Sequence, residues 1–138
     1  MPFTTTRRVA FAETDMAGIV HFANFYRYME EAEHAVLRTV GLRVIEKQAD
    51  GTTLSWPRVA ASCEFEAPAF YEDVLTISVS VERLGTKSLT LAYEFFRDEA
   101  LIATGRMTAV CCLFRDGEEM EPIAIPAEIR ARIEKIER

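Results

Sequence analysis

The longest regular element of the chain is encoded by residues 22–41, FANFYRYMEEAEHAVLRTVG. Apolar side chains recur in it at spacings of three and four residues, the period of a helix that buries one face. Gly41 predicts its end, because glycine readily enters the left-handed conformation that closes helices. We therefore predict a helix over residues 23–40, longer than average, as the central element of the core. Its apolar stripe should contain Phe22, Phe25/Tyr26, Met29, Ala32/Glu33, Val36/Leu37 and Val40.

Alternating apolar and polar side chains predict strands on both sides of this helix. The strands cover residues 5–11, 58–67, 74–82, 88–96 and 101–114. Short turns at Gly85-Thr86 and 97–99 require antiparallel pairing. One long amphipathic helix can cover the single apolar face of such a sheet, so we predict an α+β fold, a five-stranded antiparallel sheet wrapped around one long central helix. A short helix should follow Pro126, and residues 1–138 should form a single domain.

Composition argues against several classes of protein. The net charge of −6 argues against a general nucleic-acid binder, which needs a basic face. No apolar run approaches the ~20 residues that span a bilayer, and the first residues lack the apolar segment of a secretory signal. We therefore expect no membrane partner and a cytoplasmic location. The three cysteines, Cys63, Cys111 and Cys112, match no zinc-binding spacing and should be buried thiols.

The loop before the helix carries the residues best suited to chemistry. Residues 11–25, FAETDMAGIVHFANF, place the carboxylates of Glu13 and Asp15 ahead of a helix N-terminus, followed by apolar residues that could form a dry pocket. The first amides of a helix lack internal partners and carry the positive end of its dipole. They could polarise a thioester carbonyl and stabilise its oxyanion. Asp15 could then attack the carbonyl or deprotonate a water, without a metal.

Plainer interpretations of these residues remain open. Aspartate often caps a turn, which would give Asp15 a structural role. A lone histidine beside apolar residues, such as His21, is usually structural or pocket-lining. Glu31 and His34 match half of a di-iron ligand motif, but such sites need two copies on facing helices, so we expect a solvated helix face and no metal site. The chain also lacks the GxSxG, glycine-rich phosphate-loop and HExxH motifs.

Three segments together resemble one enzyme family. DMAGIV at residues 15–20, followed by an aromatic-rich stretch with Asn24-Phe25 and the long helix, is similar to the opening of the 4-hydroxybenzoyl-CoA thioesterase family. APAFYEDVLTI at residues 67–77 resembles the strand-turn-strand segment of that family, and VERLGTKS at residues 81–88 resembles its next hairpin. The resemblance runs from about Arg7 to Pro126, and the joint pattern is far more specific than any one segment.

This resemblance implies a fold, an activity and an assembly. The fold is the hotdog fold, and the activity is hydrolysis of an acyl-CoA thioester with a small, medium-chain or aromatic acyl group. Asp15 is implied as the essential carboxylate and the Phe22 backbone amide as the group that polarises the carbonyl. No cofactor is needed, because CoA is part of the substrate. Members form dimers whose sheets join edge to edge, and often tetramers, with active sites at the subunit interface.

Further residues are expected to contact the substrate or assist the reaction. Candidates around the acyl group are Gly18, Ile19, His21, Phe22, Trp56 and Tyr71, with His21 also a candidate catalytic group. Aromatic residues at such places often belong to the core instead. Arg83, Lys87, Ser88 and Arg115 could meet the CoA phosphates, although surface cations are usually only solvated.

Departures from the family pattern leave some choices open. Glu13 stands where an aspartate is common and Glu72 where a glycine is frequent, so the fine geometry of the loop and acyl pocket does not follow from the resemblance. A second hotdog subgroup uses a helix carboxylate, for which Glu30 or Glu31 would be the candidate. Alternative functions are a non-catalytic hotdog module that binds acyl-CoA, and a thioesterase acting on acyl carrier protein.

Overall fold

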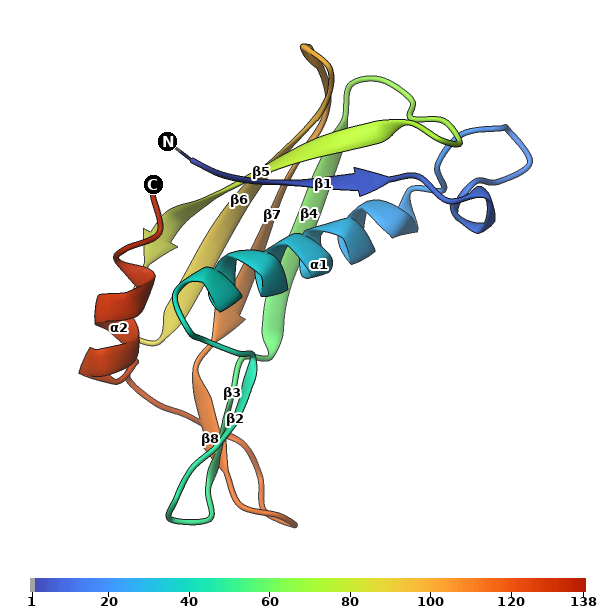
Figure 1. Cartoon of the computed structure of the whole chain (residues 1–138). Helices are drawn as coiled ribbons and strands as arrows, with labels where there is room; N and C mark the ends of the chain where they lie inside the picture. Colours follow the sequence, from blue (N-terminus) through green and yellow to red (C-terminus); the bar gives the residue numbers. More distant parts are fainter. Residues whose placement is uncertain (1) are drawn as a thin grey trace.

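One long helix lies across the concave side of a curved antiparallel sheet (Figure 1). The computed structural model describes residues 2–138. The helix is α1, Ala23–Thr39, and the sheet has the strand order β1-β5-β6-β7-β4. These strands are β1 Phe3–Arg8, β4 Arg58–Phe65, β5 Val74–Leu84, β6 Ser88–Arg97 and β7 Ala100–Val110. The predicted α+β architecture, a five-stranded antiparallel sheet around one central helix, is confirmed.

The helix α1 buries most of the predicted stripe. Gly41 follows it with a φ of 74°, the left-handed conformation expected of a residue that ends a helix. Phe22 was wrongly placed in the stripe: the helix begins at Ala23, and the Phe22 side chain is exposed. Tyr28 was not included in the predicted stripe, but its side chain is fully buried. Its ring lies under the Arg7 guanidinium, and its hydroxyl donates a hydrogen bond to Glu13.

A second, smaller sheet projects from the main body (Figure 1). Its order is β2-β3-β8-β9, formed by β2 Ile45–Lys47, β3 Thr53–Ser55, β8 Cys112–Phe114 and β9 Glu121–Pro122. The prediction of one strand over residues 101–114 is therefore wrong. The strand breaks at Cys111, whose N–H donates to the Lys87 carbonyl and whose carbonyl accepts from Ile123 N–H. Strands of two or three residues are too short to show a period, so β2, β3 and β9 were not predicted.

The ends of two predicted elements also differ. The first strand ends at Arg8 rather than at residue 11, because Val9 N–H bonds to the Asp73 carbonyl and residues 11–13 form the short 3-10 helix η1, Phe11–Glu13. The last helix, α2 Ala127–Ile133, follows Pro126 as predicted. Within residues 2–138, no helix is long and apolar enough to cross a membrane.

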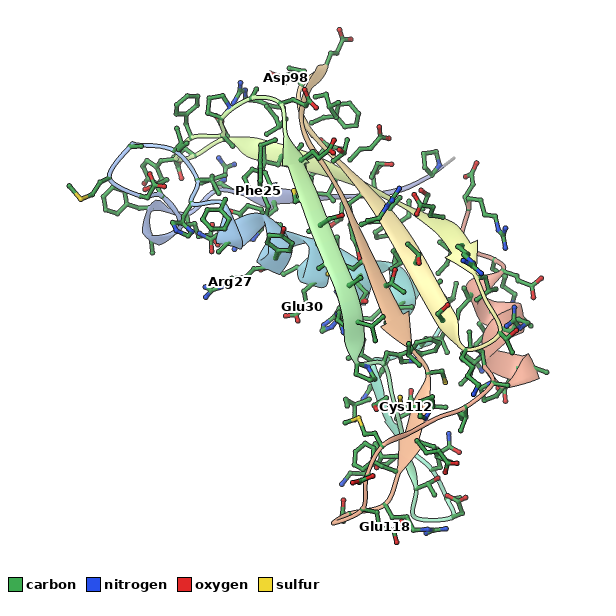
Figure 2. The ribbon with its side chains drawn as sticks, turned by 180° about the vertical axis from the view of Figure 1, so that it is seen from behind. Phe25, Arg27, Glu30, Asp98, Cys112 and Glu118 are labelled. Atoms are coloured by element: carbon green, nitrogen blue, oxygen red, sulfur yellow. The ribbon has the colours of Figure 1, made fainter. Side chains whose placement is uncertain are left out.

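Strand β4 is less buried than its alternating pattern predicted. Val59 is 62% exposed, Phe65 is also exposed and the Cys63 thiol is only half-buried. The reason is that β4 is an edge strand, paired only with β7 and interrupted by a bulge between Arg58 and Ala60. Figure 2 shows Phe25 between α1 and one end of β4, whereas Arg27 and Glu30 project from the helix away from the sheet. One apolar edge of the sheet is therefore open.

A carboxylic acid is buried where α1 faces the start of β4. Glu33 is 5% exposed, bonds to the Arg58 guanidinium, and lies 3.6 Å from His34 Nε2. Burial raises the pKa of Glu33 to about 7 even though Arg58 opposes the shift and Glu30 adds to it. Nearby on β6, the buried hydroxyl of Tyr93 has no hydrogen-bond partner among the residues described.

This burial makes stability depend on pH in a defined direction. A carboxyl group whose pKa is higher in the folded state binds more protons there, so its stabilising effect is complete below about pH 4.5 and is lost as the pH rises through about 7. Relative to Glu33→Gln, the wild-type protein should lose on the order of 2 kcal/mol of unfolding free energy between about pH 5 and pH 7.5. Urea unfolding at both pH values checks this.

The exposed neighbour Glu30 provides the control for that measurement. The Glu30→Gln variant should keep most of the pH dependence of the wild-type protein, because burial is the larger cause that raises the Glu33 pKa and the Glu30 charge the smaller. A pH dependence that is the same in wild type and Glu33→Gln would show that Glu33 does not titrate in this range.

Candidate active site

The loop between β1 and α1 forms a tight hairpin that presents Asp15. Thr14 and Val20 pair as an antiparallel bridge, and Asp15 N–H donates to the Ile19 carbonyl at 2.9 Å. Gly18 makes the return with a φ of 81°, which a glycine adopts without strain. Asp15 Oδ1 accepts from Ala17 N–H at 2.9 Å, while Oδ2 has no partner in the described part of the chain. The carboxylate thus caps its own turn with one oxygen and leaves the other without a hydrogen-bond partner in this part of the chain.

The first turn of α1 leaves one amide available. Ala23 N–H donates to the His21 ring at Nδ1, 3.2 Å away, and Asn24 N–H donates to the His21 carbonyl at 2.9 Å. Phe25 N–H donates to the Phe22 carbonyl at 3.1 Å. The Phe22 N–H itself has no hydrogen-bond partner within residues 2–138. It lies at the positive end of the helix dipole, where an oxyanion is stabilised.

Asp15 and Phe22 line the same cleft. The cleft has a volume of about 650 Å³, within the range of small-molecule sites, and Ile19 also contributes to it. Its aromatic floor is formed by Phe25, which packs edge-on against Phe65 with ring centroids 5.2 Å apart. Among the lining residues only Asp15 and Glu66 carry charge. The arrangement can hold an apolar acyl group with its carbonyl beside a carboxylate and a free amide.

Other predicted site residues have different surroundings. Gly18 and His21 belong to the same loop but do not line the cleft: Gly18 forms the turn, and His21 caps α1 and stacks on Phe22. Trp56 is buried where β3 meets β4, and its carbonyl accepts a hydrogen bond from Arg58. Tyr71 packs edge-on against Phe11 at 5.5 Å. None of these four residues lines the Asp15 cleft within one chain.

The predicted phosphate-binding residues lie at the opposite end of the sheet. Arg8 pairs with Val74 at the start of β5, beside the Asp15 loop, whereas Arg83, Lys87 and Ser88 lie around the far hairpin. The 11 residues of β5 span roughly 35 Å. Arg83 lines a separate cleft of about 520 Å³ there. Arg115 directly follows β8 of the smaller sheet and donates to the Asp50 carbonyl.

The second wall of the cleft was not predicted. Phe65 and the segment Glu66–Ala69 reach it because the chain leaves β4 next to the start of α1. The pattern of apolar residues in β4 predicts a strand but does not indicate which end of the strand faces the helix terminus. The only indication in the sequence was the resemblance of residues 67–77 to a segment of the thioesterase family. That resemblance does not predict that this segment lines the cleft.

Comparison with known proteins agrees with this geometry. The family model of the thioesterase-like superfamily matches residues 9–133, which include the loop, the helix and the whole main sheet after β1. The chain belongs to the thioesterase-like superfamily. This membership confirms the expected hotdog fold and the expected enzyme class, a thioester hydrolase.

Relatives within the superfamily support the assignment over nearly the full length. The chain is 30% identical to a 1,4-dihydroxy-2-naphthoyl-CoA hydrolase of Nostoc punctiforme, with 94% of this chain and 84% of the relative covered. It is 30% identical to a 4-hydroxybenzoyl-CoA thioesterase of Pseudomonas sp. strain CBS-3, over 91% of this chain and 92% of the relative. Among solved structures, a gentisyl-coenzyme A thioesterase superposes with a TM-score of 0.80 at 32% identity, covering 95% and 99% of the two chains.

Two substitutions of His21 distinguish a helix-capping role of its ring from the predicted catalytic role. Because Nδ1 accepts the Ala23 N–H, replacing His21 with alanine should leave that amide unpartnered and cost about 1 kcal/mol of stability. His21→Asn, which can cap the helix but cannot act as a base, should recover the stability and keep turnover within roughly threefold of wild type. Thermal unfolding and a thiol-release assay measure both. Loss of turnover in a stable His21→Asn variant would instead assign the ring a catalytic role.

Proposed function

We propose that this protein hydrolyses an acyl-CoA thioester to the free acid and CoA in the cleft beside Asp15. One observation carries the proposal: a carboxylate with a free oxygen and the unpartnered Phe22 amide line one apolar cleft. A thioester carbonyl placed between these groups has a nucleophile or base on one side and a hydrogen-bond donor on the other. The names of two relatives, which identify them as a 1,4-dihydroxy-2-naphthoyl-CoA hydrolase and a 4-hydroxybenzoyl-CoA thioesterase, support CoA as the thiol.

Two chemical routes fit these groups. In the first, an Asp15 oxygen attacks the carbonyl carbon, the CoA thiolate leaves, and water hydrolyses the resulting mixed anhydride. In the second, Asp15 takes a proton from a water molecule as that water attacks the carbonyl. In both routes the negative charge that develops on the carbonyl oxygen is stabilised by the Phe22 N–H and the helix dipole.

The lining of the cleft favours an apolar acyl group of moderate size. Ile19, Phe22, Phe25 and Phe65 present aliphatic and aromatic surface. Each CH₂ group buried there contributes about 0.8 kcal/mol, which is roughly fourfold in affinity. We therefore propose medium-chain or aromatic acyl groups as substrates in preference to acetyl. The relatives named for 4-hydroxybenzoyl-CoA and gentisyl-coenzyme A support the aromatic choice.

Substitution of the carboxylate tests the proposed chemistry. The Asp15→Asn variant should lose roughly 10²–10⁴-fold in kcat, because asparagine can neither attack the carbonyl nor accept the water proton. It should still fold and bind, since the amide oxygen can replace Oδ1 as the acceptor for Ala17 N–H. Thiol release from hexanoyl-CoA, benzoyl-CoA and acetyl-CoA measures turnover, and calorimetry measures binding. The control is Asp98→Asn, at an exposed turn whose φ of 54° asparagine tolerates.

Three results would contradict parts of this proposal. Turnover of Asp15→Asn equal to that of the wild type would remove Asp15 from the chemistry. Tight binding of acyl-CoA by the wild-type protein with no thiol released would support a non-catalytic binding module. Release of thiol from an acyl carrier protein in preference to acyl-CoA would reassign the thioester carrier.

We further propose that the functional unit is a homodimer, or a homotetramer built from it, with each site shared between two subunits. The open edge of β4 carries unpaired backbone groups and the exposed apolar side chains Val59 and Phe65, and such an edge favours pairing with another strand. Antiparallel pairing of two β4 strands about a two-fold axis would continue the sheet across both chains.

This pairing would also complete the site. Arg58 lies at the end of β4 nearest Ser88, because Arg58 pairs with Ala109 and Ser88 with Val110. Phe65, at the other end of β4, lines the Asp15 cleft. An antiparallel dimer therefore sets the hairpin end of one subunit beside the Asp15 end of the other. Such a dimer offers the predicted phosphate contacts of Arg83, Lys87 and Ser88 to a substrate bound at the partner's Asp15.

Mixing two inactive variants tests the shared site. One variant is Asp15→Asn, and the other carries Arg83→Ala together with Lys87→Ala. After joint refolding, about half of the dimers are heterodimers. In each heterodimer, one of the two sites combines an intact Asp15 with an intact Arg83 and Lys87. About a quarter of wild-type activity should therefore return. A mixture that shows only the mean of the two separate activities would mean that each site is made from one chain.

A further inference from the structure

Glu13 is the most extensively hydrogen-bonded side chain near the cleft, and the reaction proposed above does not use it. Its Oε1 accepts from Ala10 N–H at 2.8 Å, from the Tyr28 hydroxyl at 2.9 Å and from Arg7 Nη1 at 3.1 Å. Its Oε2 accepts from Arg7 Nη2. These donors belong to β1, the turn that follows it, and the second turn of α1. The Glu13 carboxylate thus joins three elements around the site.

The surroundings keep this carboxylate ionised and fixed. Burial acts to raise the pKa of Glu13, but the hydrogen bonds from Ala10, Tyr28 and Arg7 outweigh it and hold the pKa below its usual value. The pKa of Tyr28 is raised by burial and by the Glu13 carboxylate, so the phenol stays protonated and donates. Tyr28 is 0% exposed, and the Arg7 guanidinium lies 4.9 Å from the centre of its ring. The Arg7 guanidinium also donates to Glu31 and to the Arg8 carbonyl, so further contacts hold it in place.

The main chain of Glu13 reaches the helix terminus directly. Its carbonyl accepts from His21 N–H at 2.9 Å and from Asn24 Nδ2 at 2.8 Å, and the Asn24 side chain is itself buried. Asp15 follows Glu13 by two residues, and Phe22 follows His21 directly. A shift of Glu13 would therefore change the distance between the Asp15 carboxylate and the Phe22 amide.

We propose that Glu13, held by Arg7 and Tyr28, is the positioning residue that sets Asp15 against the first turn of α1. This role rests on the hydrolase function proposed above, because it concerns the geometry of that reaction. The wall of the cleft formed by Phe25, Phe65 and residues 66–69 lies outside the 9–22 loop, so a displaced loop should lower kcat far more than it raises KM. Misplacement of reacting groups by about 1 Å costs on the order of 10²-fold in rate.

Glu31 supplies a matched control for Glu13. Its carboxylate accepts from the same Arg7 guanidinium, at 2.8 Å from Nε and 3.5 Å from Nη2, whereas Glu13 accepts from Nη1 and Nη2. It is half-exposed, contacts no residue of the 9–22 loop through a hydrogen bond, and does not line the cleft. Glu31→Gln removes the same charge from the same arginine without touching the loop.

The test compares Glu13→Gln, Tyr28→Phe and Glu31→Gln in two measurements. Thiol release should show kcat reduced roughly 10- to 100-fold in Glu13→Gln and several-fold in Tyr28→Phe, with KM within about twofold of wild type. Glu31→Gln should match the wild type. Amide hydrogen exchange should be faster at His21 and Ala10 in Glu13→Gln, and unchanged in Glu31→Gln. If Glu13→Gln fails to fold, Tyr28→Phe provides the same comparison.

The two measurements separate failure of this inference from failure of the proposed function. If the wild-type protein releases no thiol from any acyl-CoA, the function fails, while exchange at His21 still tests whether Glu13 holds the loop. Wild-type kcat and wild-type exchange in a folded Glu13→Gln variant would overturn the positioning role. An equal loss of kcat in Glu31→Gln and Glu13→Gln would overturn it too. Such a result would mean that the loss comes from removing a negative charge beside Arg7 and not from moving the loop.

Discussion

Burial of one face of α1 in the curve of the sheet is the constraint on which the rest of the molecule depends. Tyr28, Met29, Ala32 and Val36 are fully or almost fully buried there. To place the helix, the chain must leave β1 at Arg8, cross the end of the sheet and turn within residues 9–22. That crossing brings the first turn of α1 beside the end of β4, where Phe65 packs against Phe25. The cleft is a direct consequence of how the helix enters the sheet.

The chemistry proposed for the site depends on the N-terminus of α1 and on the loop before it. A helix terminus has amides without partners, and here side-chain and main-chain atoms of His21 occupy two of them and leave the Phe22 N–H available. The hairpin that carries Asp15 is closed by its own hydrogen bonds, and Glu13 ties it to β1 and α1. The proposed division of roles therefore needs no metal ligand or catalytic triad: the loop supplies the carboxylate oxygen, and the helix supplies the electrophilic pull.

Features that depend on residues close together in the sequence were predicted better than features that depend on residues far apart in it. Helix periodicity and strand alternation are local, so the helix ending before Gly41 and the strands β4, β5 and β6 were predicted to within about two residues. Exposure of Val59 and the break at Cys111 depend on which strands pair, and no local pattern encodes pairing. Asp15 and Phe22 were predicted together because they belong to one segment. Phe65 was not predicted as a site residue because it reaches the cleft from a distant segment, the end of β4. Arg83 and Lys87 lie too far from Asp15 to contribute to the same site within one chain.

The proposed site requires the Phe22 amide and Asp15 to act on one carbonyl. Infrared difference spectroscopy of benzoyl-CoA carrying a ¹³C-labelled thioester carbonyl, bound to the Asp15→Asn variant, measures this polarisation directly. We predict a carbonyl stretch at lower frequency than that of free benzoyl-CoA, because a hydrogen bond from the helix terminus weakens the C=O bond. A bound carbonyl with the frequency of the free thioester would show that the amide does not contact it, and would contradict the proposed site.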